Sequence, residues 1–197
     1  MQISEKNGNL YTVLQKLYLR SAKVKELQDY IRCIPDFPEP GIMFRDITTI
    51  LQDAEGFKLA VESLKEMLAD TDVDVIAAVE ARGFVFAGAL AYALNKPLVL
   101  IRKKGKLPFD TVSEEYDLEY GTAVLEMHTD SIKKGQKVVI LDDILATGGT
   151  LKASVKLIER LGGKVSKIIC ITELKGLKGR DTLKGYTIES AVAFEGK

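Results

Sequence analysis

The hydrophobic residues of this chain recur with two different periods. Near-continuous Val- and Ile-rich runs, which suit strands buried on both faces, alternate with segments whose apolar residues fall three or four positions apart, as on one side of a helix. The runs predict strands over 73–80, 96–103, 136–143 and 164–174, and the spaced segments predict helices over 54–68, 83–94 and 150–162. Between the second and third of these strands, the sequence predicts a polar loop, and this loop is followed by an alternating strand over 116–128. This order predicts an α/β fold whose mostly parallel sheet is flanked by helices.

The N-terminal part of the chain has a different pattern. Apolar residues between positions 10 and 31 have helical spacing, which predicts an amphipathic helix, and prolines at 35, 38 and 40 then force an extended loop. A chain of 197 residues is long enough for one full-sized domain with a small attachment. We therefore predict a single domain over residues 23–197 and an N-terminal extension, helical in pattern, over 1–22.

The charge balance excludes several classes of partner. Lys and Arg together number 28, as do Asp and Glu, so no global basic field is available to hold nucleic acid or an anionic membrane. The uncharged stretch 83–95 is too short to cross a bilayer, which needs roughly 20 apolar residues. Two widely separated cysteines, Cys33 and Cys170, and the absence of an apolar signal-peptide core predict a reduced, cytoplasmic protein.

Polar chemistry follows three of the predicted strands, in "VEARGF", "IRKKGK" and "DDILATGGT". Ligands of open α/β sheets bind at the carboxyl ends of the strands, so these three segments are expected to meet at one site. In the third segment, the glycines at 148 and 149 allow a tight turn at the start of a helix, and Thr147 and Thr150 can cap it or donate hydroxyl hydrogen bonds. Such a loop can hold a phosphate.

The glycines alone fit a plain strand-to-helix turn equally well, and the two adjacent acids favour the binding site. Carboxylates are strong acceptors for the hydroxyl donors of a ribose. Asp142 and Asp143, followed by the loop, therefore fit a ribose 5-phosphate whose sugar lies on the acids. The nucleoside-triphosphate pattern GxxxxGK[ST] and the dinucleotide pattern GxGxxG are both absent.

The segment "VVILDDILATGGT" resembles the phosphoribosyl-pyrophosphate (PRPP) motif of the type I phosphoribosyltransferases. Within that family, residues 34–48, 79–91, 100–108, 116–126 and 173–183 are similar to the adenine phosphoribosyltransferases, and the similarity runs from about residue 27 to the C-terminus. The resemblance implies the type I fold with a small N-terminal hood segment near 34–48. It also implies conversion of adenine and PRPP to AMP and pyrophosphate for purine salvage.

The resemblance also implies roles for particular residues. PRPP and AMP would be bound by Asp142, Asp143, Ala146, Thr147, Gly148, Gly149 and Thr150, pyrophosphate by Arg82, Arg102 and Lys106, and adenine by Met43, Phe44 and Arg45. Glu119 would transfer the purine proton beneath a mobile loop over 105–118. Mg²⁺ would arrive with PRPP without direct protein ligands. A homodimer is expected, because the family residue matching Arg102 reaches the neighbouring subunit, and neither nucleic acid nor membrane is expected as a partner.

Two alternatives remain open from the residues. The loop over 142–150 binds only the shared substrate, so a transferase for hypoxanthine, guanine or xanthine differs from the adenine enzymes only in "FPEPGIMFRDIT". A non-catalytic regulator of the same fold that binds nucleic acid is disfavoured by the balanced charge.

Overall fold

The computed structural model describes residues 25–117 and 121–196. Most of the amphipathic helix predicted over 10–31 lies outside this range, as does the predicted extension over 1–22. Within the described part, Leu27–Tyr30 form a single 3-10 turn, η1, and the first strand begins at Arg32. The predicted helix therefore does not continue to Ile31, whose backbone is extended.

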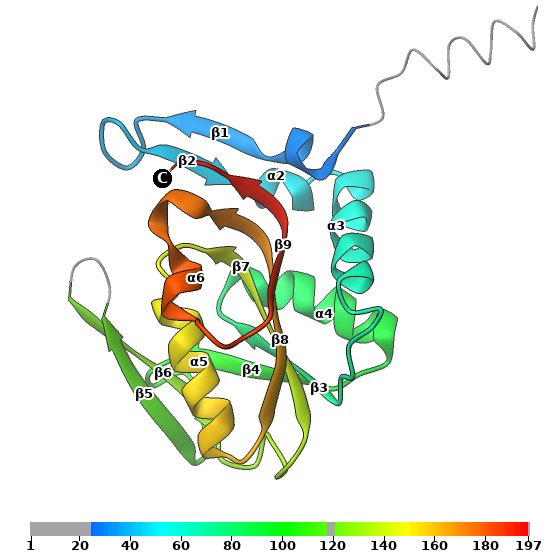
Figure 1. Ribbon diagram of the computed structural model, residues 1–197, viewed down its shortest axis with the longest axis vertical. Helices are drawn as coiled ribbons and strands as arrows, with labels where there is room; N and C mark the ends of the chain where they lie inside the picture. Colours follow the sequence, from blue (N-terminus) through cyan, green and yellow to red (C-terminus); the bar gives the residue numbers. More distant parts are fainter. Residues whose placement is uncertain (1–24, 118–120, 197) are drawn as a thin grey trace, which may run out of the picture.

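Seven strands form the central sheet, in the order β5-β6-β4-β3-β7-β8-β9 (Figure 1). Their bounds are Val75–Val79 for β3, Leu98–Lys103 for β4, Thr111–Asp117 for β5, Thr122–His128 for β6, Lys137–Leu145 for β7, Lys164–Leu174 for β8 and Ile188–Phe194 for β9. The five strands from β4 to β9 in this order run parallel, whereas β6 pairs antiparallel with both β4 and β5. The mostly parallel sheet predicted from the sequence is thus confirmed.

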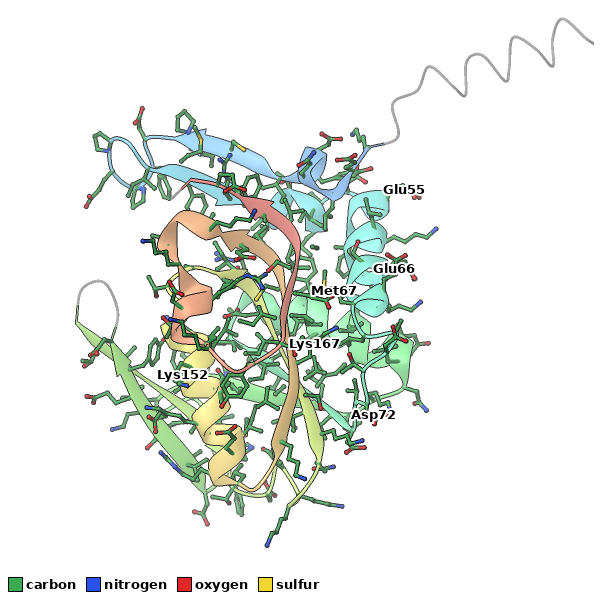
Figure 2. The ribbon with its side chains drawn as sticks, viewed as in Figure 1. Glu55, Glu66, Met67, Asp72, Lys152 and Lys167 are labelled. Carbon is green, nitrogen blue, oxygen red and sulfur yellow. The ribbon has the colours of Figure 1, made fainter. Side chains whose placement is uncertain are left out.

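Helices cover both faces of the sheet (Figure 1). The helices are α2 (Thr48–Leu51), α3 (Ala54–Glu66), α4 (Arg82–Leu94), α5 (Gly149–Arg160) and α6 (Gly179–Thr182), with a 3-10 turn, η2 (Lys175–Leu177), before α6. Helices α3 and α4 pack on one face and α5 on the other. Lys167 of β8 donates a hydrogen bond to the carbonyl of Met67 at the end of α3, which ties this helix to the sheet (Figure 2).

The side chains of β3 explain why the strand sequence is continuously apolar. All five residues are buried, and successive side chains point to opposite faces. Val75, Ala77 and Val79 join the core beneath α5, whereas Ile76 and Ala78 join the core beneath α3 and α4. A strand covered by helices on both sides has no solvent face, so a period of two is not visible in its sequence.

Two predicted segments differ from the structure. The polar loop predicted before residue 116 contains strand β5, which forms an antiparallel hairpin with β6, because Thr111 to Asp117 find backbone partners from His128 to Thr122. A second hairpin forms where the proline-rich loop was predicted: β1 (Arg32–Pro35) pairs antiparallel with β2 (Met43–Asp46), Pro35 ends β1, and Pro38 and Pro40 lie in the turn. This N-terminal hairpin lies across the carboxyl end of the sheet, beside the end of β9 (Figure 1). Of the helices described, none has the length and apolar character needed to span a bilayer.

Candidate active site

Two adjoining cavities lie at the carboxyl ends of the parallel strands. The first, which we call the strand-end cavity, has a volume of about 240 Å³ and lies between β3, β7 and the start of α5. Of the residues predicted to bind PRPP, it is lined by Asp142, Asp143, Ala146, Thr147, Gly148 and Thr150. The sequence prediction that these residues gather at one place therefore agrees with the geometry of the cavity.

The loop between β7 and α5 is held by close backbone packing. Gly148 has a left-handed backbone with φ of +84°, and a Cβ atom there would lie 2.6 Å from the carbonyl oxygen of Gly179. A Cβ atom on Gly179 would overlap the carbonyl oxygen of Ala146. Thr182 donates a hydrogen bond of 2.8 Å to the carbonyl oxygen of Thr147. Segment 179–182 thus packs against the loop. The close approach leaves no room for a side chain at Gly148 or at Gly179.

Gly149 faces a different neighbour. A Cβ atom there would lie 3.1 Å from the carbonyl oxygen of Asp117 and 3.3 Å from the ring of Tyr116. The end of β5 therefore packs over the first turn of α5, and Tyr116 also lines the strand-end cavity.

The two adjacent acids have different surroundings. Asp142 is buried and accepts a hydrogen bond of 2.8 Å from the backbone N–H of Asp143. Burial, together with the neighbouring charge of Asp143, raises the pKa of Asp142 well above its usual value. Asp143 instead accepts a hydrogen bond of 2.5 Å from Nε of Arg82, at the start of α4. Among the described residues, Asp143 forms an ion pair and Asp142 does not.

The second cavity, which we call the hairpin cavity, has a volume of about 370 Å³ and is enclosed mainly by apolar side chains. It lies between the N-terminal hairpin and the ends of β7 and β8, and it is lined by Met43, Phe44, Arg45, Arg82, Asp143, Ile144, Thr172, Leu174 and other residues. All three residues predicted to bind adenine are among them. Arg82 lines this cavity rather than the strand-end cavity, and Asp143 lines both.

The hairpin orients its aromatic and basic side chains through a few contacts. Phe44 meets Phe37 edge to face, with ring centroids 5.2 Å apart. The guanidinium of Arg45 lies 4.3 Å from the ring centroid of Phe194 on β9, and its Nη1 donates to Sγ of Cys33 at 2.5 Å. The side chain of Arg45 is therefore held by Phe194 and Cys33.

The other two predicted pyrophosphate ligands share one anionic partner. Glu80, at the end of β3, accepts a hydrogen bond of 2.9 Å from Nε of Arg102 and one of 3.0 Å from Nζ of Lys106. Burial acts to raise the pKa of Glu80, but the hydrogen bonds from Lys106 and Arg102 outweigh it and keep this pKa below its usual value. Glu80 lines the strand-end cavity, so its two cationic partners lie at the edge of that cavity.

An ion pair between the half-exposed Arg180 and the buried Glu173 anchors the segment that supports the loop. Both nitrogens of the Arg180 guanidinium fork donate to Glu173, each at 2.7 Å, and Ser190 donates to the same carboxylate at 3.2 Å. These hydrogen bonds lower the pKa of Glu173, with Arg180 as the main cause. Glu173 lies at the end of β8 and Arg180 in α6, so the pair joins α6 to the sheet.

Several residues in these cavities were not predicted from the sequence. Glu80, Lys103 and Tyr116 line the strand-end cavity, and Thr172, Leu174 and Leu177 line the hairpin cavity. Glu80 and Thr172 stand at or near strand ends, which is a usable signal, whereas Tyr116 lies near the end of β5, of which only residues 116 and 117 fell in the strand predicted over 116–128. Glu119 lies outside the described residues. Among those described, no group of three or more His, Cys, Asp and Glu side chains could hold a metal ion.

Comparisons with known proteins identify the family of the chain. Residues 47–191 match the phosphoribosyl transferase domain family. The adenine phosphoribosyltransferase of Butyrivibrio fibrisolvens is 62% identical over 174 residues, which are 88% of this chain and 96% of that protein. The crystal structure of the adenine phosphoribosyltransferase of Thermoanaerobacter pseudethanolicus superposes with a TM-score of 0.83 at 54% identity, covering 85% of this chain and 98% of the other.

A more distant structure is similar over the same extent. The adenine phosphoribosyltransferase of Saccharomyces cerevisiae, complexed with adenine and an imino-altritol bisphosphate, has a TM-score of 0.80 at 34% identity over 84% of this chain and 96% of that chain. The family match covers more than half of the chain, and the relatives are covered over nearly their whole length. The chain therefore belongs to the type I phosphoribosyltransferases and, within that family, is an adenine phosphoribosyltransferase.

Proposed function

We propose that this enzyme transfers the 5-phosphoribosyl group of PRPP to adenine across the boundary between the two cavities, forming AMP and pyrophosphate. One observation carries this proposal. The strand-end and hairpin cavities share Asp143 and Ile144, so a sugar phosphate in one and a flat apolar base in the other would meet at Asp143. The transfer joins a ring nitrogen of adenine to the ribose carbon that loses pyrophosphate, which requires two such compartments in contact.

The strand-end cavity would hold the ribose 5-phosphate part of PRPP. The loop of Ala146, Thr147, Gly148, Gly149 and Thr150 would bind the 5-phosphate, because the first N–H groups of α5 have no partner within the helix and its positive end favours an anion. Asp142 and Asp143 would accept hydrogen bonds from the ribose hydroxyls. The backbone packing of Gly148 against Gly179 supports this assignment, because it holds the loop in one conformation before the phosphate arrives.

The hairpin cavity would hold adenine. Phe44 would stack on the ring, with its own orientation set by Phe37, and the backbone of Met43 and Arg45 would bind the polar edge of the base. The engagement of the Arg45 side chain with Phe194 supports a backbone role for this residue. The bound adenine of the yeast enzyme supports a base site in this fold.

Arg82, Arg102 and Lys106 would bind the pyrophosphate group and stabilise the negative charge that builds on it as it departs. Mg²⁺ would enter with PRPP and be held by its oxygens and water. Asp143 pairs with Arg82, and Glu80 pairs with Arg102 and Lys106. Because these carboxylates already have cationic partners, this pairing supports a Mg²⁺ ion that is held by PRPP rather than by the protein. Mg²⁺ would supply further charge neutralisation at the pyrophosphate.

Glu119 would control the purine proton. The ribose carbon passes through a state resembling an oxocarbenium ion, and the attacking nitrogen is a better nucleophile when the ring proton of adenine is accepted by a base. The hairpin of β5 and β6 leads to residues 118–120, and the end of β5 packs on α5 beside the loop. That packing supports a position for segment 105–118 over the cavity, where it would exclude water from the cationic intermediate.

A homodimer in the cytoplasm is the proposed working form. Val85 and Tyr92, seven residues apart on α4, are 46% and 90% exposed, and Leu100 on the neighbouring β4 is 38% exposed. Large apolar side chains gathered on one surface favour a protein interface. Arg102 follows on the same strand, so this interface would bring a second copy close to the pyrophosphate side of the site. Light scattering of the native chain and of Tyr92→Glu, which should dissociate the dimer, tests this assembly.

The free thiols of Cys33 and Cys170 support a reducing compartment.

A panel of purines tests the proposed base site. With PRPP and Mg²⁺, adenine should give AMP, whereas hypoxanthine and guanine should react poorly, because a 6-oxo group presents a different hydrogen-bonding edge to the hairpin backbone. Phe44→Ala should raise the KM for adenine more than the KM for PRPP. Equal turnover of hypoxanthine and adenine would contradict the proposed reading of the base.

A further inference from the structure

One carboxylate pairs with two of the four cations of the basic segment 102–106, namely Arg102 and Lys106. Glu80, whose side chain is only 6% exposed, pairs with Arg102 through one oxygen and with Lys106 through the other, at 2.9 and 3.0 Å. The two cations are themselves connected, because Nη1 of Arg102 donates to the carbonyl oxygen of Lys106 at 3.1 Å. The three side chains therefore form a closed network at the end of β3.

The backbone around this network is firmly held. The N–H of Glu80 donates to the carbonyl oxygen of Ile101 at 3.0 Å, which fixes the end of β3 against β4. The turn after β4 is anchored separately, because the N–H of Gly105 donates to the buried carboxylate of Glu126 at 2.8 Å. The network can therefore open by side-chain rotation, without unfolding the turn or the strand end.

Glu80 also lines the strand-end cavity, together with Thr147 and Gly148 of the loop. A pyrophosphate group beside this cavity would carry several negative charges close to the carboxylate. Arg102 and Lys106 would then have two competing acceptors: Glu80 on the protein, and the pyrophosphate of this site or, for Arg102, of the neighbouring subunit's site. Two anions in contact repel each other, and the repulsion is larger near a poorly solvated carboxylate than in water.

We infer that Glu80 is an internal counter-anion that competes with pyrophosphate for Arg102 and Lys106. Without pyrophosphate, it keeps both cations folded against the edge of the cavity. When pyrophosphate binds, the cations move from Glu80 to the ligand, and when pyrophosphate leaves they return. The competition weakens the binding of pyrophosphate and assists its release as a product. The inference rests on the proposed function in one respect, namely that these two cations bind pyrophosphate.

Removal of the charge without change of shape tests the competition. In Glu80→Gln, the amide cannot compete for the cations as a charged group, so magnesium pyrophosphate should bind about tenfold more tightly. Calorimetric titration of the intact enzyme with magnesium pyrophosphate measures this change. Glu189→Gln is the matched control, because Glu189 also pairs with a lysine, Lys167, at 2.8 Å, and neither residue lines the strand-end or the hairpin cavity. The control should leave the affinity for pyrophosphate unchanged. Unchanged or weaker binding in Glu80→Gln would overturn the inference.

A further variant separates this inference from the proposed function. Lys106→Gln should weaken binding of magnesium pyrophosphate; if it does not, the assignment of the cation to pyrophosphate fails, and the competition fails with it. If Lys106→Gln weakens binding and Glu80→Gln does not tighten it, the assignment stands and only the competition is overturned.

The wild-type enzyme provides a test that does not depend on the folding of a variant. In a crystal structure with magnesium pyrophosphate bound, both contacts of Glu80 should open beyond the ion-pair range of about 4 Å. Retention of the contacts from Arg102 and Lys106 to Glu80 in that complex would overturn the inference.

Discussion

Arg82 and Asp143 lie 61 residues apart in the chain and are joined by a hydrogen bond of 2.5 Å between Nε and Oδ2. Arg82 begins α4, Asp143 lies near the carboxyl end of β7, and the pair stands where the two cavities meet. The side chain of Asp143 is 10% exposed and that of Arg82 is 47% exposed. The pair therefore orients Asp143 while part of the Arg82 side chain remains accessible.

Replacement of Arg82 by Gln should lower kcat/KM for PRPP by about tenfold or more, because a charged donor is lost and the largely buried Asp143 loses its cation. Arg82→Lys should not restore activity, because an ammonium group cannot reproduce the planar guanidinium geometry. Steady-state kinetics with varied PRPP measures the effect. Lys137→Gln, which removes a pair with Asp72 away from both cavities, is the control. A kcat/KM for Arg82→Gln within twofold of wild type would contradict a role for this pair.

Asp142→Asn should stabilise the protein and weaken the binding of PRPP. Because burial and Asp143 raise the pKa of Asp142, the folded protein disfavours its charged form at neutral pH. A raised pKa favours folding at low pH, and that advantage is lost as the pH rises through the folded-state pKa. The Asn variant should thus have the higher melting temperature at pH 7, and the difference should narrow toward the ordinary Asp pKa of about 3.9.

The same substitution removes charge-assisted hydrogen bonds to the ribose, worth roughly 1.5–3 kcal/mol. Calorimetry with PRPP measures this loss, and thermal unfolding across the pH range measures the gain in stability. The Asn side chain keeps the oxygen that accepts from the N–H of Asp143, so local geometry should survive. An Asn variant that melts below wild type at pH 7 would contradict the expected effect on stability.

Gly179→Ala should weaken the binding of AMP by about tenfold while changing the binding of adenine much less. The added Cβ would overlap the carbonyl oxygen of Ala146 and lie 2.7 Å from Leu145, so the loop that would hold the phosphate must shift. Thr182→Val, which removes only the hydrogen bond to Thr147, should have a smaller effect in the same direction. Calorimetry with AMP and with adenine compares the two ligands. Equal losses for both would indicate general misfolding rather than a displaced loop.

Glu119→Gln should reduce kcat by about 10²–10⁴-fold and change PRPP affinity little, because the amide keeps the size of the side chain and loses its basic oxygen. Single-turnover rates of AMP formation measure the chemical step directly. Glu115→Gln, the same chemical change four positions earlier in the sequence, provides the control. A Glu119→Gln enzyme with kcat within threefold of wild type would mean that water or substrate phosphate accepts the proton instead.

The sequence by itself determined the parts of the protein that are built from neighbouring residues. The unit that ends in the proposed phosphate loop is the clearest case: a strand predicted over 136–143 and a helix over 150–162 correspond to β7 and α5, and β8 has the predicted bounds of 164–174. Burial on both faces makes these strands continuously apolar, and one-sided burial makes the helix periodic, so each leaves its own pattern in the chain. The adjacency of two acids, two glycines and two threonines is likewise visible without coordinates.

Tertiary structure alone decided which distant residues meet. Strand β5 exists because its polar, half-exposed residues find backbone partners on β6, and no run of apolar residues announces it. The family resemblance implied that Arg82, Arg102 and Lys106 all bind pyrophosphate, but it did not indicate that Arg82 pairs with Asp143 and the other two with Glu80. Gly179 lies against Ala146 because α6 folds back over the loop. Contacts of this kind depend on strand order, register and helix packing over many residues, whereas a local pattern reports only whether each residue is buried or exposed in its own element.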